Sequence, residues 1–181
     1  MRIGACISVS AALAVLGAAL AGAQGTPPTA PCTAAAITAV RATGDAITEV
    51  VWNQGQIDRL GEFYTADVVR HVPERPDPIV GLEANKAYIR QVRQAFPDSR
   101  VTTERAFTDG ANAAVYWVWS GTHTGDMPGL PATGKKVVLP GISLVRVRDG
   151  KFAEIWDQDD QLSLLVQLGV IQLPPPPPAA K

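Results

Sequence analysis

Residues 113–125, AAVYWVWSGTHTG, decide the fold because their side chains fall into two alternating sets. One face of an extended chain would carry Val115, Trp117, Trp119, Gly121 and His123. The other face would carry Tyr116, Val118, Ser120, Thr122 and Thr124. A period of two is typical of a β-strand, whose successive side chains point to opposite sides. The stretch therefore predicts a long strand.

Three further strand-like runs lie around this one. They are VTTERAFT (101–108), KKVVLPGISLVRVR (135–148) and KFAEIWD (151–157). Asp109-Gly110 and Asp149-Gly150 lie between runs, and Asp-Gly pairs favour the tight turns of β-hairpins. The longer connection GDMPGLPATG (125–134) predicts a hairpin loop, with a lid as the alternative. Together the four runs predict an antiparallel meander.

Helical patterns come before the meander. The first follows three- and four-residue spacing through Ile37, Val40, Gly44, Ile47 and Val51. Thr33 can cap its start, and residues 53–55 (Asn-Gln-Gly) end it. A second, short helix is predicted around residues 57–64, a short strand at 68–72 (VVRHV) and a third helix at 82–96.

A last helix is predicted to begin at Asp159 or Asp160, either of which can cap it, and to end near Gly169. Helices first, then a meander, then a terminal helix predict an α+β domain. We expect the N-terminal helices to pack on one side of a curved antiparallel sheet. Such a sheet can wrap over a helix and leave a conical pocket.

The stretch GTHTGDMPGLPATGKKVVLPGISLVRVRDGKFAEIWDQDDQLSLLVQLG (121–169) closely resembles the SnoaL-like polyketide cyclases, also called ester cyclases. Residues 64–73 (YTADVVRHVP) and 78–98 (PIVGLEANKAYIRQVRQAFPD) resemble the same family. The resemblance runs from about Ile37 to Val170. It implies the cone-shaped nuclear-transport-factor-2-like fold, which ketosteroid isomerase shares.

The resemblance also implies a cyclase or isomerase-type enzyme that closes a ring by intramolecular aldol condensation, with no cofactor. The substrate would be a small hydrophobic carbonyl compound in the conical pocket. In the polyketide cyclases an aspartate late in the sheet serves as acid and base. That role falls on Asp157 at the end of EIWD, with Asp160 as second choice. The last two strands carry no histidine of the kind that family cyclases place near that aspartate; Ser143, Val145 and Ile155 occupy the neighbouring positions.

The strand KFAEIWD also singles out Asp157 on physical grounds. Its alternation places Ala153, Ile155 and Asp157 on one face, and Phe152, Glu154 and Trp156 on the other. A carboxylate among small apolar neighbours loses hydration, and a poorly hydrated carboxylate is a better base toward a carbon acid. The alternative is that Asp157 ends the strand at the surface.

His123 and His71 are the other catalytic candidates, because an imidazole could donate a hydrogen bond to a substrate oxygen. Each could equally be a structural histidine at a strand end. The two histidines with Asp157 could form a facial metal triad. We nevertheless predict no metal site.

Aromatic side chains are expected to hold the substrate at the mouth and wall of the cone. The substrate-binding candidates are Trp52, Tyr64, Trp117, Trp119 and Asp160. For the aromatic residues the alternative is an ordinary place in the core. For Asp160, as for Asp159, the alternative is capping of the last helix.

Residues 1–23 predict a secretory signal peptide cleaved after Ala23, and hence an exported protein, periplasmic or secreted. A retained membrane anchor is the alternative, since the apolar run is nearly long enough to span a bilayer. We predict a flexible linker at 24–32, one domain at 33–173 and a Pro-rich tail at 174–181. The net charge of −1 without blocks of like charge argues against nucleic acid, and against membrane binding after cleavage.

Two other functions remain open on the same fold. One is a non-catalytic module that binds a small molecule or serves as a dimer scaffold; the other is a hydrolase or dehydratase. A buried Asp157 facing an enclosed cavity with a second polar group would favour an enzyme. A histidine paired with Asp157 would favour hydrolysis or dehydration. Related folds also suggest a homodimer through the open sheet face.

Overall fold

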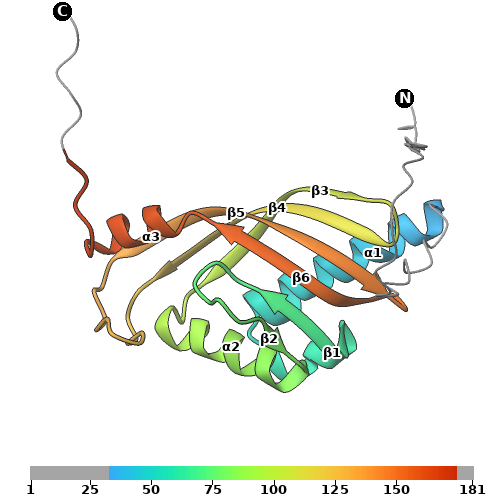
Figure 1. Cartoon of the computed structure of the whole chain (residues 1–181), viewed down its shortest axis with the longest axis horizontal. Coiled ribbons are helices and arrows are strands. Elements are labelled where there is room, and N and C mark those ends of the chain that lie inside the picture. Colours follow the sequence, from blue (N-terminus) through green and yellow to red (C-terminus); the bar gives the residue numbers. More distant parts are fainter. Residues whose placement is uncertain (1–32, 175–181) are drawn as a thin grey trace, which may run out of the picture.

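The computed structural model of the protein describes residues 33–174 (Figure 1). The predicted signal peptide (1–23), the predicted linker (24–32) and nearly all of the predicted tail (174–181) lie outside the described residues. In the part of the chain that the structure describes, no helix is long and apolar enough to cross a membrane.

One six-stranded sheet forms the body of the domain, with the strand order β2-β1-β6-β5-β4-β3. The strands are β1 (Tyr64–His71), β2 (Ile79–Val80), β3 (Arg100–Thr108), β4 (Asn112–Thr122), β5 (Lys136–Arg148) and β6 (Lys151–Asp159). Strands β3 to β6 form the predicted antiparallel meander. Both Asp-Gly turns are present, and Asp149 (φ 52°) and Gly150 (φ 74°) adopt the left-handed backbone that a tight hairpin turn requires.

Strand β1 lies beside β6 and runs parallel to it, whereas the sequence pattern predicted an antiparallel sheet throughout. A parallel pair needs a long connection between its strands. Here that connection contains β2, helix α2 (Leu82–Ala95) and the strands β3, β4 and β5. Strand β1 also begins at Tyr64, four residues before the predicted strand, because the short helix before it ends at Glu62.

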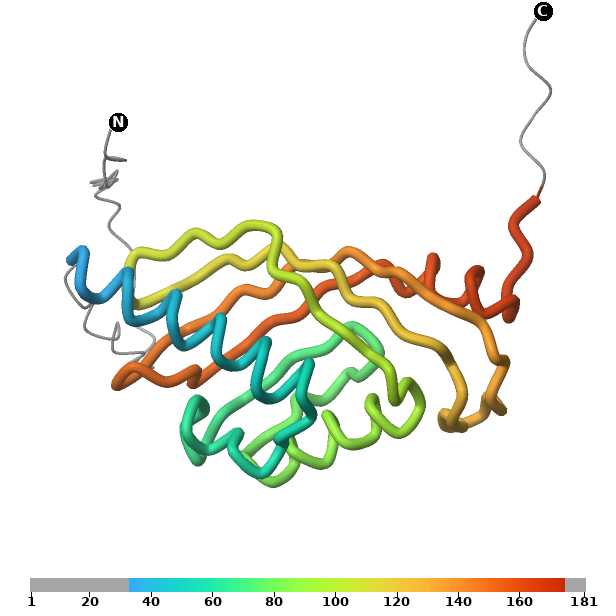
Figure 2. The backbone as a smooth tube through the Cα atoms, turned by 180° about the vertical axis from the view of Figure 1, so that it is seen from behind, coloured from blue at the N-terminus to red at the C-terminus, as the bar shows by residue number. Residues whose placement is uncertain are grey.

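Helices cover one face of the sheet, and the predicted α+β architecture is confirmed (Figure 2). The first helical pattern is divided into α1 (Ala34–Ala46) and a π-helical turn η1 (Ile47–Asn53), followed by a 3-10 turn η2 (Ile57–Glu62). Thr33 Oγ1 accepts a hydrogen bond from the Ala36 N–H at 3.1 Å, as its predicted capping role requires.

The last helix, α3 (Gln161–Leu168), settles which of the two acids caps it. Asp160 Oδ1 accepts a hydrogen bond from the Ser163 N–H at 2.9 Å, and Gly169 ends the helix at φ 76°. Asp159 is the last residue of β6 instead. The predicted helix limits are therefore correct, with Asp160 as the cap.

A β-bulge in β6 changes one predicted orientation. The pairing of β5 with β6 shifts between Arg146 and Val147, so that Ala153 is an extra residue in its strand. Phe152 and Ala153 are consequently both buried, and the ring of Phe152 stacks on Tyr64 with centroids 6.0 Å apart. The prediction that Phe152 points away from the Asp157 face was wrong because simple alternation assumes an unbroken ladder.

Candidate active site

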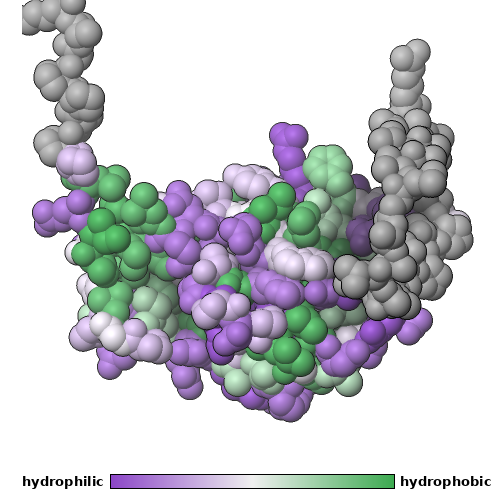
Figure 3. Space-filling model, in the orientation of Figure 1, coloured by the Kyte–Doolittle hydropathy of each residue, from purple (hydrophilic) through white to green (hydrophobic). Residues whose placement is uncertain are grey.

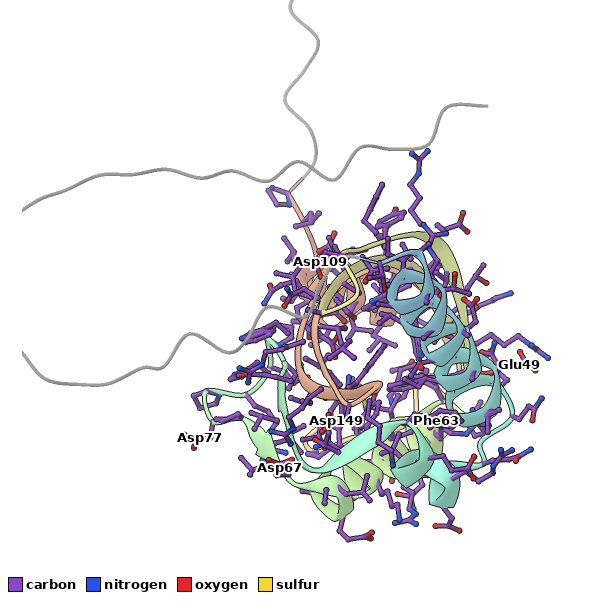
Figure 4. The ribbon with its side chains drawn as sticks, turned by 90° about the vertical axis from the view of Figure 1, so that its right-hand side faces the viewer. Glu49, Phe63, Asp67, Asp77, Asp109 and Asp149 are labelled. Carbon is purple, nitrogen blue, oxygen red and sulfur yellow. The ribbon has the colours of Figure 1, made fainter. Side chains whose placement is uncertain are left out.

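A cavity of about 830 Å³ lies between the inner face of the sheet and the helices. Its lining is mainly apolar and includes Val40, Ile47, Val115, Leu139 and Val145. Figure 4 looks along the molecule from the α1 end and shows many side chains directed between α1 and the sheet, while Glu49 and Asp77 lie outside. A mainly apolar cavity of this size, with polar groups placed in its wall, is the usual form of a small-molecule site.

The carboxylate of Asp157 forms part of the cavity wall, and its side chain is 14% exposed. Both of its oxygens have donors. Ser143 Oγ donates to Oδ1 at 2.5 Å, and Arg70 Nη1 donates to Oδ2 in an ion pair. Ser143 lies directly opposite Asp157 in the β5–β6 register, so the ladder itself sets this contact.

Arg70 projects from β1 into the protein, and only 4% of it is exposed. Besides Asp157, its guanidinium donates to Tyr64 Oη at 2.5 Å and to Asn85 Oδ1 at 3.1 Å. Burial acts to lower the pKa of Arg70, but the neighbouring Tyr64 and Asp157 reverse this and raise it. The site therefore holds one fixed positive charge beside the carboxylate.

Three aromatic rings surround that charge. The Arg70 Cζ atom lies 5.8 Å from the Trp52 ring centre, 5.7 Å from Tyr64 and 5.9 Å from Tyr88. Rings at this distance attract a guanidinium through their negative faces. Burial raises the pKa of both tyrosines, so both remain neutral phenols that can donate a proton in a hydrogen bond.

Trp117 extends the polar contacts of the site across β4. Its Nε1–H donates to Ser143 Oγ at 2.8 Å, so Trp117, Ser143 and Asp157 form a continuous chain of hydrogen bonds. The indole lies over Gly141, where a Cβ atom would be 2.2 Å from the ring. Glycine at 141 is therefore what allows the indole to lie flat on β5 and reach Ser143.

Four of the predicted substrate-binding residues line the cavity, namely Trp52, Tyr64, Trp117 and Trp119. Trp119 also packs edge-on against Phe96, with ring centres 4.8 Å apart. Asp160 does not line this cavity; it is exposed and caps α3. Its predicted contact with substrate and its second-choice role as base receive no support from this position.

The two candidate histidines lie elsewhere, and neither lines the cavity. His71 stacks on Trp156 with centroids 5.3 Å apart and contacts Glu154 at 3.0 Å, on the other face of the sheet from Asp157. His123 is fully buried, and its Nδ1 accepts a hydrogen bond from the Thr133 N–H at 3.2 Å. The structure thus brings neither histidine to Asp157, and their catalytic roles stay predictions.

Asp159 is a second carboxylate in the cavity wall, two residues beyond Asp157 on the same strand face. Its Oδ1 accepts a hydrogen bond from Gln161 Nε2 at 2.8 Å. Burial is the largest of the causes that raise the pKa of Asp159, and the nearby charge of Asp157 acts in the same direction.

Among the described residues no group of three or more His, Cys, Asp or Glu side chains is placed to hold a metal ion. The 125–134 connection contributes Met127 and Pro128 to the cavity lining. It is held against the end of α2, since Thr124 and Gly125 both donate backbone hydrogen bonds to Ala95 O (Figure 2).

Arg70 is the main site residue that the sequence did not reveal. The alternation of Val68, Arg70 and Val72 puts the arginine between two buried valines, and that pattern could have marked it as inward-facing. Asn85, which is fully buried and orients Arg70, lies on α2 with no local signal of its role.

Comparison with known proteins agrees with this architecture. The family described as SnoaL-like polyketide cyclase matches residues 43–168. The chain is 30% identical over 128 residues to an aklanonic acid methyl ester cyclase of Streptomyces sp. (strain C5), covering 65% of this chain and 74% of that protein. It is 27% identical over 119 residues to the nogalonic acid methyl ester cyclase of Streptomyces nogalater, covering 65% and 89%.

Solved structures show the same fold. A putative SnoaL-like polyketide cyclase from Jannaschia sp. CCS1 superimposes with a TM-score of 0.71 at 21% identity, covering 77% of this chain and 98% of that one. IdmH, a putative polyketide cyclase from Streptomyces antibioticus, gives a TM-score of 0.62 at 28% identity, covering 72% and 98%. With its fold, its matched residues and its curated relatives in agreement, this chain belongs to the SnoaL-like polyketide cyclase family.

Proposed function

We propose that this protein is an exported ring-closing enzyme that works by acid–base chemistry, without a cofactor, on a hydrophobic carbonyl compound. Asp157 is the general base of the proposed reaction. One observation carries the proposal: the Asp157 carboxylate lies in the wall of a large apolar cavity and is held there by Arg70 and Ser143. A positioned carboxylate in a poorly hydrated site is the basic requirement for removing a proton next to a carbonyl group.

The proposed reaction moves one proton and forms one carbon–carbon bond. Asp157 takes the proton from a carbon next to a carbonyl group, and the electron pair of that C–H bond forms an enolate. The enolate carbon attacks a second carbonyl carbon of the same molecule and closes a ring. The oxygen of that second carbonyl takes up a proton and becomes a hydroxyl. Substrate and product are isomers, so no oxidant or reductant is needed.

The polar groups around Asp157 support this assignment. Arg70 supplies a fixed positive charge, and the phenol of Tyr64, hydrogen-bonded to Arg70, also lines the cavity. Fixed donors and charges in a site with little water stabilise a developing enolate without having to reorganise. Trp52, Trp117 and Trp119 offer aromatic surface on which a planar ring system could lie.

The test uses aklanonic acid methyl ester, the compound that the curated relatives' names specify, as the probe. Proton NMR in D₂O would follow deuterium uptake at the acidic carbon, and chromatography would follow ring closure. We expect the wild-type protein to do both, and Asp157→Asn to slow both by about 10²–10⁴-fold. Glu154→Gln, on the opposite face of the same strand, is the matched control and should retain both rates. Equal rates for wild type and Asp157→Asn would rule out Asp157 as the base.

Binding without turnover is the second candidate function, and one observation favours it. Both oxygens of Asp157 already have donors, so a substrate would have to compete with Arg70 and Ser143 for the carboxylate. Titrating the same probe while following tryptophan fluorescence would separate the two functions. Quenching without deuterium uptake would favour binding alone. Hydrolysis or dehydration receives no comparable support, because the donors to Asp157 are an arginine and a serine and not a histidine.

Export rests on the sequence of residues 1–23. If the whole chain is produced in a bacterial host, we expect mature protein outside the cytoplasm with Gln24 as its first residue. N-terminal sequencing of the fractionated protein provides the measurement. A cytoplasmic protein that keeps its first 23 residues would rule export out.

We also propose that two copies pair through the outer face of the sheet. Tyr116, Ile142, Leu144 and Trp156 lie there with between 37% and 51% of each residue exposed. Apolar surface that continues across several strands is typical of a protein interface. Light scattering should give twice the monomer mass for the wild type and the monomer mass for Leu144→Glu. A monomeric wild type would contradict the proposal.

A further inference from the structure

We propose that Asp159 is a second proton-transfer residue in this cavity, and that it donates the proton that the oxygen of the attacked carbonyl takes up on ring closure. The inference rests on the proposed function, because it divides one reaction between two carboxylates. In this division Asp157 is the base and Asp159 is the acid.

Asp157 and Asp159 are two residues apart on β6, and both line the cavity. Alternate residues of a strand share one face and lie roughly 6–7 Å apart along it. A bound molecule can therefore contact both carboxylates at once, with its acidic carbon at one and its acceptor oxygen at the other.

The two carboxylates differ in what holds them. Asp157 accepts hydrogen bonds on both oxygens, and one of its donors is a buried arginine. Within residues 33–174 the side chain of Asp159 accepts one hydrogen bond, from the neutral amide of Gln161, and forms no ion pair. A partly buried carboxylate with no cation beside it favours its neutral form, as an acid requires.

The charged side chains near Asp159 also favour its neutral form. Burial is the largest contribution and raises the pKa of Asp159, whereas the hydrogen bond from Gln161 is the next largest and lowers it. The negative charge of Asp157, and to a smaller degree that of the exposed Asp160, raises the pKa further. A carboxylate that favours its neutral form, two residues from one held by an arginine and a serine, suits the role of acid beside a base.

The wall around Asp159 helps to keep water away. Its partner across β5 is Gly141, and the indole of Trp117 covers that glycine. Leu164 and Leu165 of α3 and Met127 also line the cavity. An acid that is partly shielded from solvent keeps its proton for the bound molecule instead of exchanging it freely.

The protons balance over one cycle. Asp157 gains one proton when the C–H bond breaks, and Asp159 loses one when the O–H bond of the product forms. Transfer of a proton from Asp157 to Asp159, through water that enters as product leaves, restores both groups. Because Asp159 supplies the proton to the acceptor oxygen, the protonated Asp157 does not have to turn toward that oxygen.

The first test does not depend on activity. Carbon NMR of the aspartate carboxyl groups in the folded, mature protein would give the pKa of Asp159, with Asp159→Asn for assignment. We expect a pKa clearly above the ordinary value of about 3.9. A pKa at or below that value would overturn the inference, even if the wild type closes rings.

The second test separates the two half-reactions with the same probe, aklanonic acid methyl ester. Asp159→Asn keeps the acceptor for Gln161 and the size of the side chain, so the fold should survive. We expect it to slow ring closure by about 10²-fold or more and deuterium uptake far less, whereas Asp157→Asn should slow both. Closure by Asp159→Asn at the wild-type rate overturns this inference and leaves Asp157 as the base. A wild type that takes up no deuterium overturns the proposed function and this inference with it.

Discussion

Arg70 on β1 and Asp157 on β6 form an ion pair across the one parallel pair of strands in the sheet. In their register Arg70 is the partner of Ile155, so its guanidinium reaches diagonally to Asp157. The pair is largely buried, with side-chain exposures of 4% and 14%. Removing Arg70 would leave the largely buried charge of Asp157 without its counter-ion and with the neutral Ser143 hydroxyl as its donor.

Arg70→Met should therefore lower the free energy of unfolding by about 3–5 kcal/mol, the usual cost of removing one partner of a buried pair. Urea unfolding followed by circular dichroism measures this. Arg146→Met is the control, because Arg146 pairs with Glu154 on the outer face and is 45% exposed. Its cost should stay within about 1 kcal/mol. If both variants lose the same free energy of unfolding, the buried ion pair does not stabilise the protein more than the exposed one.

Gly141→Ala should disturb both stability and the site. The new methyl group would lie 2.2 Å from the nearest atom of the Trp117 ring, so the indole must move away from Ser143. We expect a loss of about 1–3 kcal/mol, the usual cost of overpacking. Tryptophan fluorescence should also change in the folded state.

Gly44→Ala is the matched control for that substitution. The nearest atom to a new Cβ at Gly44 is 3.8 Å away, in ordinary contact, and the residue lies within α1. Alanine should be neutral there or stabilise by up to about 1 kcal/mol. If Gly141→Ala is equally well tolerated, the indole does not depend on the glycine.

Asp160→Ala should lower the free energy of unfolding by about 1 kcal/mol, because α3 loses its cap. Asp160→Asn should cost much less, since asparagine caps a helix as well as aspartate does. Thermal unfolding of the two variants provides the comparison. Equal losses would show that the negative charge of Asp160, and not its capping hydrogen bond, is what α3 needs.

Asp159→Asn should make the protein more stable at neutral pH. Burial raises the pKa of Asp159 in the folded state, so the folded protein binds this proton more tightly than the unfolded chain. The penalty to folding is absent below about pH 3.9, the unfolded pKa, grows as the pH rises from there to the raised folded pKa, and is constant above it. The gain from asparagine should be present at pH 7 and vanish at low pH. A gain in the free energy of unfolding that does not change with pH would contradict a raised pKa of Asp159 in the folded state.

Local patterns in the sequence were enough to predict most elements but not their long-range partners. The alternation from Val115 to Trp119 and the two Asp-Gly turns specify the meander, because neighbouring hairpin strands need only local information. Nothing local to β1 indicates that it joins β6, and the predicted sheet therefore lacked its parallel pair. The bulge at Ala153 was hidden for the same reason, since it exists only relative to β5.

The candidate site shows the same limit. Asp157 could be singled out because its own strand places it among apolar neighbours, and Trp52, Tyr64, Trp117 and Trp119 do line the cavity. Arg70 was not among the predicted site residues, whereas its neighbour His71 was; the two side chains point to opposite faces of β1. Its role depends on an acid that is 87 residues away in the chain, which no local pattern encodes.

That separation has a consequence for how the protein matures. Contacts between residues far apart in sequence form late, because the chain must close a long loop before they return any free energy. The ion pair cannot form until β6, near the end of the domain, has been made. The proposed signal peptide implies that the chain is exported unfolded. The protein would then be inactive during synthesis and export, and it would become active only after β6 has crossed the membrane and paired with β1.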